Sequence, residues 1–386
     1  MGGPFSTDSD PAVTVVGAGV AGLGCAIVLA QAGRRVVVRE AHGRVGARFH
    51  GDFQGLENWS SDRDVLEELA SHGIGPHFDH HPVRAGTVFD AWGHQYHVAS
   101  RRPVYYLVRR GSEAGTLDHG LLVRARELGV EVRFNARVRH VDGPAVLAGG
   151  PRVAEAIAAG YVFETDMADG DWLALDDRLA PAGYAYLLIH GGRGTVASCL
   201  FTGFKQEAEY VARTVEMFRA RVGLRMRDPR PFGGFANFRL PRSAIQGGHL
   251  VIGEHAGFQD ALAGFGMRYA LRSGILAARS LIEGTDYRSL WRRQLLPQLR
   301  ASVTNRMLFE LAGAAGRRWV VRRHLAGGDV RETLRRLYLV PVVSRLLFPL
   351  AYWRYRRRLA DPSCDHIDCA CVWCRCGGAR AVPQIS

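Results

Sequence analysis

The sequence predicts an α/β protein with a Rossmann-like dinucleotide-binding domain, an antiparallel-sheet domain and a helical C-terminal region. Three observations predict this class: a strand, glycine-rich turn, helix and second strand within residues 13–48, strand-like runs between residues 154 and 242, and basic segments after Leu311. The chain has 386 residues, 47% of them hydrophobic and 23% charged, so it is long enough to form two domains and a tail.

Residues 13–40 form the dinucleotide-binding unit. Four β-branched residues, typical of a buried parallel strand, lead directly into a G-x-G-x-x-G turn. Gly17 permits the tight turn, Gly19 lets the backbone approach a pyrophosphate, and Gly22 allows the following helix to pack against the strand. The second strand ends at Glu40, whose carboxylate is expected to accept hydrogen bonds from ribose hydroxyls.

The stretch after the second strand distinguishes FAD from NAD. Residues 40–48 read E-A-H-G-R-V-G-A-R, which resembles the E-x-x-x-x-x-G-G-R stretch of FAD-dependent oxidoreductases. Ala47 takes the place of the second glycine, and Arg48 stands at the arginine of the pattern. The resemblance implies that this is a Rossmann-like FAD-binding domain and that FAD is the cofactor.

Residues 101–134 predict a strand, a loop, a helix over 117–128 and a strand over 130–134. The segment resembles Y-x-V-x-R-x-x-F-D-x-x-L of flavoproteins related to p-hydroxybenzoate hydroxylase and geranylgeranyl reductase. The matching positions are Tyr106, Val108, Arg110, Asp118 and Leu121, with a longer loop between the arginine and the aspartate. The resemblance implies that Arg110 contacts FAD, while an exposed loop arginine is the other interpretation.

Residues 250–267 parallel the G-D-A-A-G-x-x-x-P-x-x-G-x-G motif of the same flavoproteins, followed by a helix over 268–282. In that family the segment holds the ribityl chain and pyrophosphate, and it brings backbone amides toward the flavin. Glu254 replaces the aspartate and Ala261 the proline, and the longer carboxylate can still accept the same hydrogen bond. The implied cofactor-binding residues are Gly253, Glu254, Asp260, Gly264, Gly266 and Met267.

The region between these motifs predicts a substrate domain. Strand-like runs at residues 161–165, 184–190 and 195–201 favour an antiparallel sheet. Residues 183–194 resemble the G-Y-x-W-x-F-P…G-x-G signature of geranylgeranyl reductases, which saturate isoprenoid double bonds. The resemblance implies a hydrophobic slot, with Tyr184, Tyr186 and His190 as candidate catalytic proton sources. A strand that faces only the core is the alternative.

The predicted domains are 11–150 with 232–285 for FAD, 151–231 for substrate, 286–360 as a basic helical region and 361–386 as a cysteine-rich tail. The net charge is +13 with a pI near 9.9, yet no nucleic-acid-binding motif accompanies the arginines. We therefore expect no nucleic acid as a partner. The apolar run at 337–355 is interrupted by Pro341, Arg345 and Pro349, so it predicts an interfacial segment on an anionic membrane or a helix packed on the substrate domain.

The tail places five cysteines within thirteen residues: Cys364, Cys369, Cys371, Cys374 and Cys376. In a reducing compartment this density favours zinc or an iron-sulfur cluster, and a redox-reactive thiol tail is the alternative. Cys25 and Cys199 are interpreted as core residues.

Together these features predict an FAD-dependent oxidoreductase that reduces C=C bonds of an isoprenoid or other lipophilic substrate, with the resemblance covering residues 11–312. A flavin monooxygenase or dehydrogenase, or an electron-relay flavoprotein, are the alternatives. No second G-x-G-x-x-G supports a stable NADPH site, so the external electron donor, ferredoxin-like or NAD(P)H, stays open. The first ten residues lack signal-peptide features, which predicts a cytoplasmic protein, free or peripheral on the inner face of the cell membrane.

Overall fold

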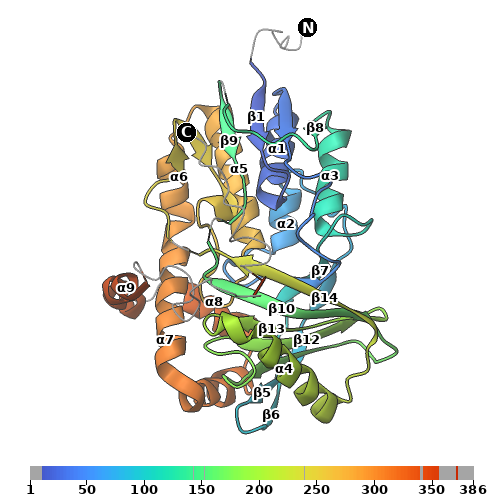
Figure 1. Cartoon of the computed structure of the whole chain (residues 1–386). Helices are drawn as coiled ribbons and strands as arrows, with labels where there is room; N and C mark the ends of the chain where they lie inside the picture. Colours follow the sequence, from blue (N-terminus) through green and yellow to red (C-terminus); the bar gives the residue numbers. More distant parts are fainter. Residues whose placement is uncertain are drawn as a thin grey trace.

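The computed structural model describes residues 11–141, 143–151, 153–238, 240–339, 342–355 and 371–372. These residues form three sheets flanked by helices, which confirms the predicted α/β class (Figure 1). The first strand and helix lie at the top of Figure 1, the largest sheet at the bottom, and the C-terminal helices mostly on the left.

The first sheet has six strands in the order β15-β16-β9-β1-β2-β8 and is parallel except for the β15–β16 hairpin. The strands are β1 Val13–Val16, β2 Val36–Arg39, β8 Glu131–Arg133, β9 Ala145–Leu147, β15 Ile245–Gln246 and β16 His249–Val251. Helix α1, Val20–Gln31, packs against both α3, Leu117–Glu127, and α5, Met267–Glu283. This is the predicted Rossmann-like unit, and its helices bury the apolar β1.

The second sheet has seven strands in the order β14-β10-β13-β12-β11-β5-β6. Their bounds are β5 Ala85–Asp90, β6 Gln95–Ala99, β10 Ala156–Glu164, β11 Gly170–Leu175, β12 Tyr184–His190, β13 Arg193–Leu200 and β14 Arg227–Ala236. Leu187 and Ile189 face helix α4, Glu207–Val222, whereas Leu188 packs on the third sheet. That sheet, in the order β3-β7-β4, consists of β3 Phe53–Glu57, β4 His81–Val83 and β7 Tyr105–Arg109.

The second sheet differs from the expected substrate domain in two respects. Strands β5 and β6 belong to it, although residues 85–99 fall in the segment expected to bind FAD. The pair β5–β11 is parallel, while every other pair in the sheet is antiparallel. A pairing between strands about eighty residues apart leaves no local pattern, so the sequence could not indicate it.

The C-terminal region is helical, as expected. Its helices are α6 Tyr287–Gln294, α7 Leu296–Val320, α8 Val330–Tyr338 and α9 Val342–Tyr355, and the remaining helical elements are α2 Val65–Ala70 and the short turns η1 Phe204–Gln206, η2 Gly253–His255 and η3 Val321–Leu325. Helix α7 runs from the first sheet to the second and is kinked at Gly313 (Figure 1). None of the described helices has the length and apolar character needed to span a membrane.

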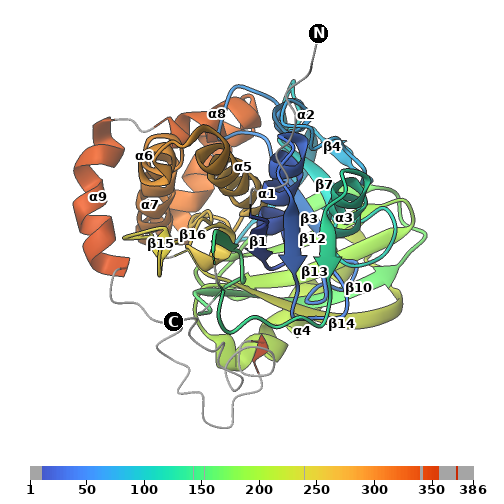
Figure 2. The ribbon, with the colours of Figure 1, turned by 90° about the horizontal axis from the view of Figure 1, so that it is seen from above.

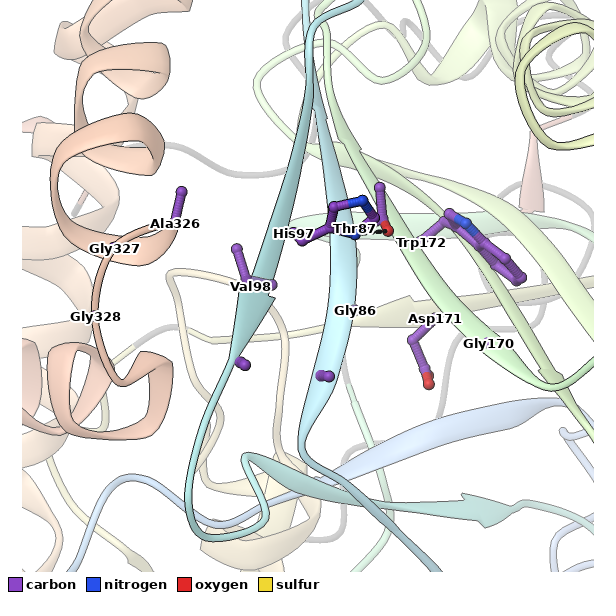
Figure 3. A pocket seen from close by; sticks show the side chains of 12 residues that line it. Gly86, Thr87, His97, Val98, Gly170, Asp171, Trp172, Ala326, Gly327 and Gly328 are labelled. Carbon is purple, nitrogen blue, oxygen red and sulfur yellow. Dashed lines mark hydrogen bonds between the residues drawn. The ribbon is translucent and has the colours of Figure 1, made fainter.

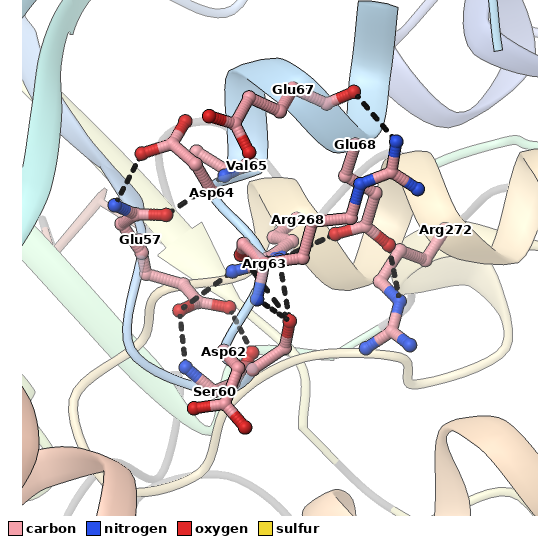
Figure 4. Close-up of polar contacts among 12 residues, drawn as sticks. Glu57, Ser60, Asp62, Arg63, Asp64, Val65, Glu67, Glu68, Arg268 and Arg272 are labelled. Atoms are coloured by element: carbon pink, nitrogen blue, oxygen red, sulfur yellow. Dashed lines mark hydrogen bonds and ion pairs between the residues drawn. The ribbon is translucent and has the colours of Figure 1, made fainter. Parts of the chain in front are cut away.

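A buried ion-pair cluster fixes the start of α5 (Figure 4). The Arg268 guanidinium, 1% exposed, lies 2.5 Å from the Glu68 carboxylate of α2 and 3.8 Å from Glu57 at the end of β3. Arg272 adds a second contact to Glu68 at 3.0 Å. Since a buried charge left without its partner is costly, the cluster holds α5 against α2 and β3.

Candidate functional site

The glycine-rich turn between β1 and α1 has one position that faces open space. A Cβ at Gly17, whose φ is +109°, would lie 2.4 Å from the Ala148 carbonyl oxygen, and one at Gly22 would lie 2.0 Å from that of Gly17. A Cβ at Gly19 would meet no atom within 4 Å. The fold therefore requires two of the glycines, and the third opens the α1 N-terminus, which no side chain caps, to a ligand.

Glu40 lies at the carboxyl end of β2, directly beside this turn. One carboxylate oxygen accepts a hydrogen bond from the Ala18 amide and the other from the His42 amide, both at 2.8 Å. The side chain is 13% exposed, so a carboxylate edge is available next to the turn where the sequence predicted a ribose contact.

Two motifs that lie more than two hundred residues apart meet through Arg48 and Glu254. The Arg48 Nη2 atom lies 2.6 Å from Glu254 Oε2, and the side chains are 39% and 13% exposed. Gly253 has φ +61° and approaches Ala21 of α1 so closely that a Cβ would lie 2.8 Å from the alanine methyl group. Asn237 donates a hydrogen bond to the Glu254 carbonyl oxygen at 3.3 Å. The structure thus brings both predicted segments to the same edge of the first sheet.

Arg110 lies beneath this edge in a buried ion pair. Its Nε and Nη2 atoms donate to the two Asp118 oxygens, both at 2.8 Å, and its guanidinium stacks 3.9 Å from the Phe49 ring. Burial alone would lower the pKa of Arg110, but the Asp118 carboxylate outweighs it and the pKa is raised. Arg110 consequently anchors the loop between β7 and α3, and Arg48, which stacks 4.8 Å from Phe49 on a more exposed side, is the arginine available to a ligand.

The loop from Asp260 to Met267 ends at the N-terminus of α5. Asp260 is buried and accepts hydrogen bonds from the Tyr338 hydroxyl at 2.6 Å and the Ala263 amide at 2.8 Å. Burial raises its pKa to about 6, although both hydrogen bonds lower it. Gly264 has φ +77° and open space at its Cβ position, whereas a Cβ at Gly266 would collide with the Gln259 side chain. Asp260 therefore holds the loop to α8, and Gly264 is the point of the loop with open space beside it.

Of the three candidate catalytic residues, Tyr184 contacts this loop and Tyr186 lies beside Tyr184. Tyr184 and Tyr186 lie on the same face of β12 with ring centroids 6.1 Å apart, and the Tyr184 hydroxyl donates to the Ala263 carbonyl oxygen at 2.5 Å. Burial raises the pKa of both phenols well above 10. His190 lies at the other end of β12, about 20 Å along the strand. There it stacks 4.1 Å from His81, and its Nδ1 lies 2.8 Å from an Asp169 oxygen.

A cavity of about 720 Å³ adjoins the Glu254 loop. Its apolar wall comes from Phe201, which directly follows β13, from Phe238, from Val303 of α7, and from Tyr352 and Tyr355 of α9. Four charged groups in the wall form two ion pairs, Arg306 with Glu310 at 3.0 Å and Arg317 with Asp177. The sequence did not predict this cavity, because most of its wall comes from segments that lie far apart in the chain and carry no motif. The sequence also provided no signal for Phe49 and Gln259, which lie beside and within motif segments at positions that the motifs do not specify, or for Asn237, which lies outside them.

A second hollow of about 560 Å³ lies at the β5–β6 edge of the second sheet, facing the turn at residues 326–328 (Figure 3). Its ionisable residues are His97 and Asp171, and Asp171 accepts a hydrogen bond from Tyr105 at 2.8 Å. It contains none of the residues that the sequence predicted for cofactor or catalysis.

Of the predicted metal ligands, only Cys371 lies within the described residues. It is 1% exposed and belongs to an apolar cluster with Val372, Ile157 and Phe204. Cys364, Cys369, Cys374 and Cys376 lie outside the described residues. The described part of the chain contains no group of three or more potential metal ligands. Cys25 and Cys199 are buried, as expected.

Comparisons with known proteins agree with this geometry. Residues 15–59 match the family model described as an NAD(P)-binding Rossmann-like domain. The chain is similar to the solved structure of a geranylgeranyl bacteriochlorophyll reductase-like protein from Thermoplasma acidophilum, with a TM-score of 0.62 and 16% identity over 89% of this chain and 98% of that one. The chain has the fold of the FAD-binding flavoproteins.

Other proteins whose solved structures have this fold carry out different reactions. The flavin-dependent brominase Bmp2 has a TM-score of 0.63 at 16% identity and covers 89% of this chain and 98% of its own. The p-nitrophenol 4-monooxygenase PnpA from Pseudomonas putida DLL-E4 has a TM-score of 0.60 at 16% identity, with coverages of 85% and 96%. No curated protein sequence matches the chain. Since a fold does not determine a reaction, these similarities establish the architecture alone.

Proposed function

We propose that the chain is an FAD-dependent oxidoreductase that acts on a lipophilic small molecule and reduces C=C bonds of an isoprenoid. The observation that carries the proposal is the convergence of an open glycine turn, Glu40 and the Arg48–Glu254 pair next to an apolar-walled cavity. Ligand sites of α/β proteins commonly lie at the carboxyl ends of parallel strands, which is where these residues meet.

The described residues fit FAD. The open side of Gly19 and the first amides of α1 would hold the pyrophosphate, and Glu40 would accept from ribose hydroxyls. Arg48, Glu254 and the loop at Gly264 would hold the ribityl chain and the ring. When bound, FAD supplies hydride transfer, the chemistry that no side chain can provide.

The protein's own groups would bind the substrate, exclude water and retain a proton near the ring. Phe201 and Phe238, which wall the cavity, pack in the same cluster as Tyr184 and Tyr186. Because their pKa values lie well above 10, both phenols stay protonated at neutral pH. The Tyr184 hydroxyl, held at the Ala263 carbonyl oxygen, is the proton donor that we favour.

A flavin monooxygenase is the second candidate, favoured by the similarity to the brominase and to the p-nitrophenol monooxygenase at comparable TM-scores. Turnover with oxygen separates the two. We expect anaerobic, chemically reduced enzyme to add two hydrogen atoms to each double bond of a polyprenyl substrate, detected by mass spectrometry. Turnover that requires oxygen and adds an oxygen atom would contradict the reductase. The conservative Tyr184→Phe variant should lower the rate while FAD retention stays unchanged.

We also propose that the cysteine-rich tail binds one metal centre, which would be electron-accepting if iron-sulfur and purely structural if zinc. Metal analysis and a visible spectrum of anaerobically purified protein, recorded after FAD is removed, test this. Protein without stoichiometric iron or zinc, in which all five tail thiols are free when titrated in denaturant, would instead support the redox-reactive thiol tail.

A further inference from the structure

The outward face of α9 is apolar and exposed. Val342, Leu346, Leu350 and Trp353 follow one another at steps of four, four and three residues, which places them on one side of a helix. They are 70%, 74%, 54% and 62% exposed. Figure 2 shows α9 as the outermost element on its side of the molecule, beyond α7.

The opposite face of α9 holds the helix in place. Ala351 is buried against Val303 and Met307 of α7, with Leu347 and Tyr355 packed around them. The outward residues therefore contribute little to the packing of the helix. Exposed apolar side chains are also concentrated in this part of the chain. Ten of the twelve exposed large hydrophobic residues in the described ranges lie between positions 308 and 353. Large apolar side chains that are exposed together on one helix face, as on α9, indicate a surface that contacts something apolar.

The charge of this surface is positive. Helix α9 contains Arg345 and Arg354 and no acidic residue, and three arginines follow it directly in the sequence at 356–358. Arg345 is exposed and has no carboxylate partner among the described residues, while Arg354 pairs with Glu310. A second copy of the same face would bring these arginines together in a chain whose net charge is already +13. Anionic lipid provides both the apolar layer and the opposite charge.

We propose that α9, the residues from Val342 to Tyr355, docks on the surface of an anionic lipid bilayer. The helix has 14 residues and is about 21 Å long, shorter than the roughly 30 Å hydrocarbon core, so it lies along the surface. Trp353 on the outward face suits the headgroup region. On the inward side Tyr352 and Tyr355 wall the cavity near the Glu254 loop, which places that cavity beside the lipid. The docking does not depend on which reaction the cavity supports.

The test is flotation of the full chain with vesicles of phosphatidylcholine alone and with vesicles in which about a third of the lipid is phosphatidylglycerol. We expect binding to the anionic vesicles that weakens between about 0.05 M and 0.5 M salt. Leu346→Ser/Leu350→Ser should reduce the partition coefficient roughly tenfold or more, because two leucine side chains that the bilayer would bury are lost. The matched control Trp92→Ser/Ile282→Ser changes two exposed hydrophobic residues elsewhere and should bind like the wild type.

A variant that changes only charge provides an independent check. Arg345→Glu should weaken binding to anionic vesicles and leave the far-ultraviolet circular dichroism unchanged, because the side chain is exposed. Equal binding of wild type, Leu346→Ser/Leu350→Ser and Arg345→Glu would overturn the proposal, as would equal partition onto neutral and anionic vesicles at low salt. A dimer in solution that Leu346→Ser/Leu350→Ser dissociates would overturn it in favour of a second copy.

Discussion

At the residue scale, the three glycines of the first turn serve different purposes. Substituents at Gly17 and Gly22 would collide with backbone atoms, so these positions are required by the fold itself. Gly19 has open space and an unstrained φ of −77°, so a side chain there would leave the fold intact and occupy the volume in front of α1. A substitution at Gly19 therefore separates ligand binding from folding.

We expect Gly19→Val to weaken FAD binding strongly without unfolding the protein. Losing about two hydrogen bonds to phosphate, at about 1.5 kcal/mol each, would weaken binding about a hundredfold. Flavin fluorescence titration of the apoprotein measures this. Gly327→Val is the control, since Gly327 also has open space at its Cβ and lies in an exposed turn at the second sheet. A folded Gly19→Val protein with wild-type affinity would refute the assigned cradle.

The buried carboxyl group of Asp260 leads to a prediction about how stability depends on pH. Its pKa in the folded protein, about 6, lies above its ordinary value of 3.8, chiefly because the carboxyl is buried. The folded state thus binds this proton more tightly than the unfolded chain, and the group's contribution to stability is fully present below about pH 4 and is lost as the pH rises to about 6.

In Asp260→Asn this loss should disappear, because the amide can keep both hydrogen bonds if the Tyr338 hydroxyl rotates to accept. Relative to wild type, the variant should gain about 2 kcal/mol of unfolding free energy between pH 4 and pH 7, as measured by urea denaturation. Asp171→Asn serves as the comparison, because burial also raises the pKa of Asp171 to about 6. A difference that does not change with pH would contradict the assignment.

At the element scale, helices α1 and α5 pack closely against each other, and two glycines in this contact meet different neighbours. A Cβ at Gly274 would lie 2.4 Å from the Ala21 carbonyl oxygen, whereas one at Gly24 would lie 3.1 Å from a methyl group of Leu271. The Ala21 backbone cannot move away to make room for a methyl group, whereas the Leu271 side chain can.

Gly274→Ala should therefore destabilise the protein by about 1–3 kcal/mol, and Gly24→Ala should be neutral or stabilising by up to about 1 kcal/mol through helix propensity. Thermal or urea unfolding of the two variants decides between them. Equal effects at the two positions would mean that the contact between the helices is looser than described.

Elements with a strong local pattern could be predicted from the sequence. The helix expected at 117–128 is found as Leu117–Glu127, the strand expected at 184–190 is found as Tyr184–His190, and α5 differs by one residue at each end. Strands β5 and β6 could not be assigned to the second sheet, because that pairing depends on contacts with β11 far along the chain. The glycines and Glu40 were predictable as motif positions. The buried ion pair between Arg110 and Asp118 was not.

At the scale of the whole molecule, the candidate site forms where the first sheet, the second sheet and the C-terminal helices meet. The sequence indicated the first two contributors through motifs, and it missed the third because α7 and α9 enter the cavity wall through packing alone. The same helices provide the exposed apolar surface, so the region first distinguished by its charge also shapes the cavity.

The central claim is that this fold binds FAD, and the most direct measurement is the cofactor content of the purified full-length chain. The cofactor is released by denaturation and is identified and quantified by chromatography and absorbance. We predict FAD at about one molecule per chain, either as purified or after reconstitution with FAD. A folded protein that retains no flavin, cannot be reconstituted with FAD and instead binds NAD(H) or NADP(H) would contradict the account.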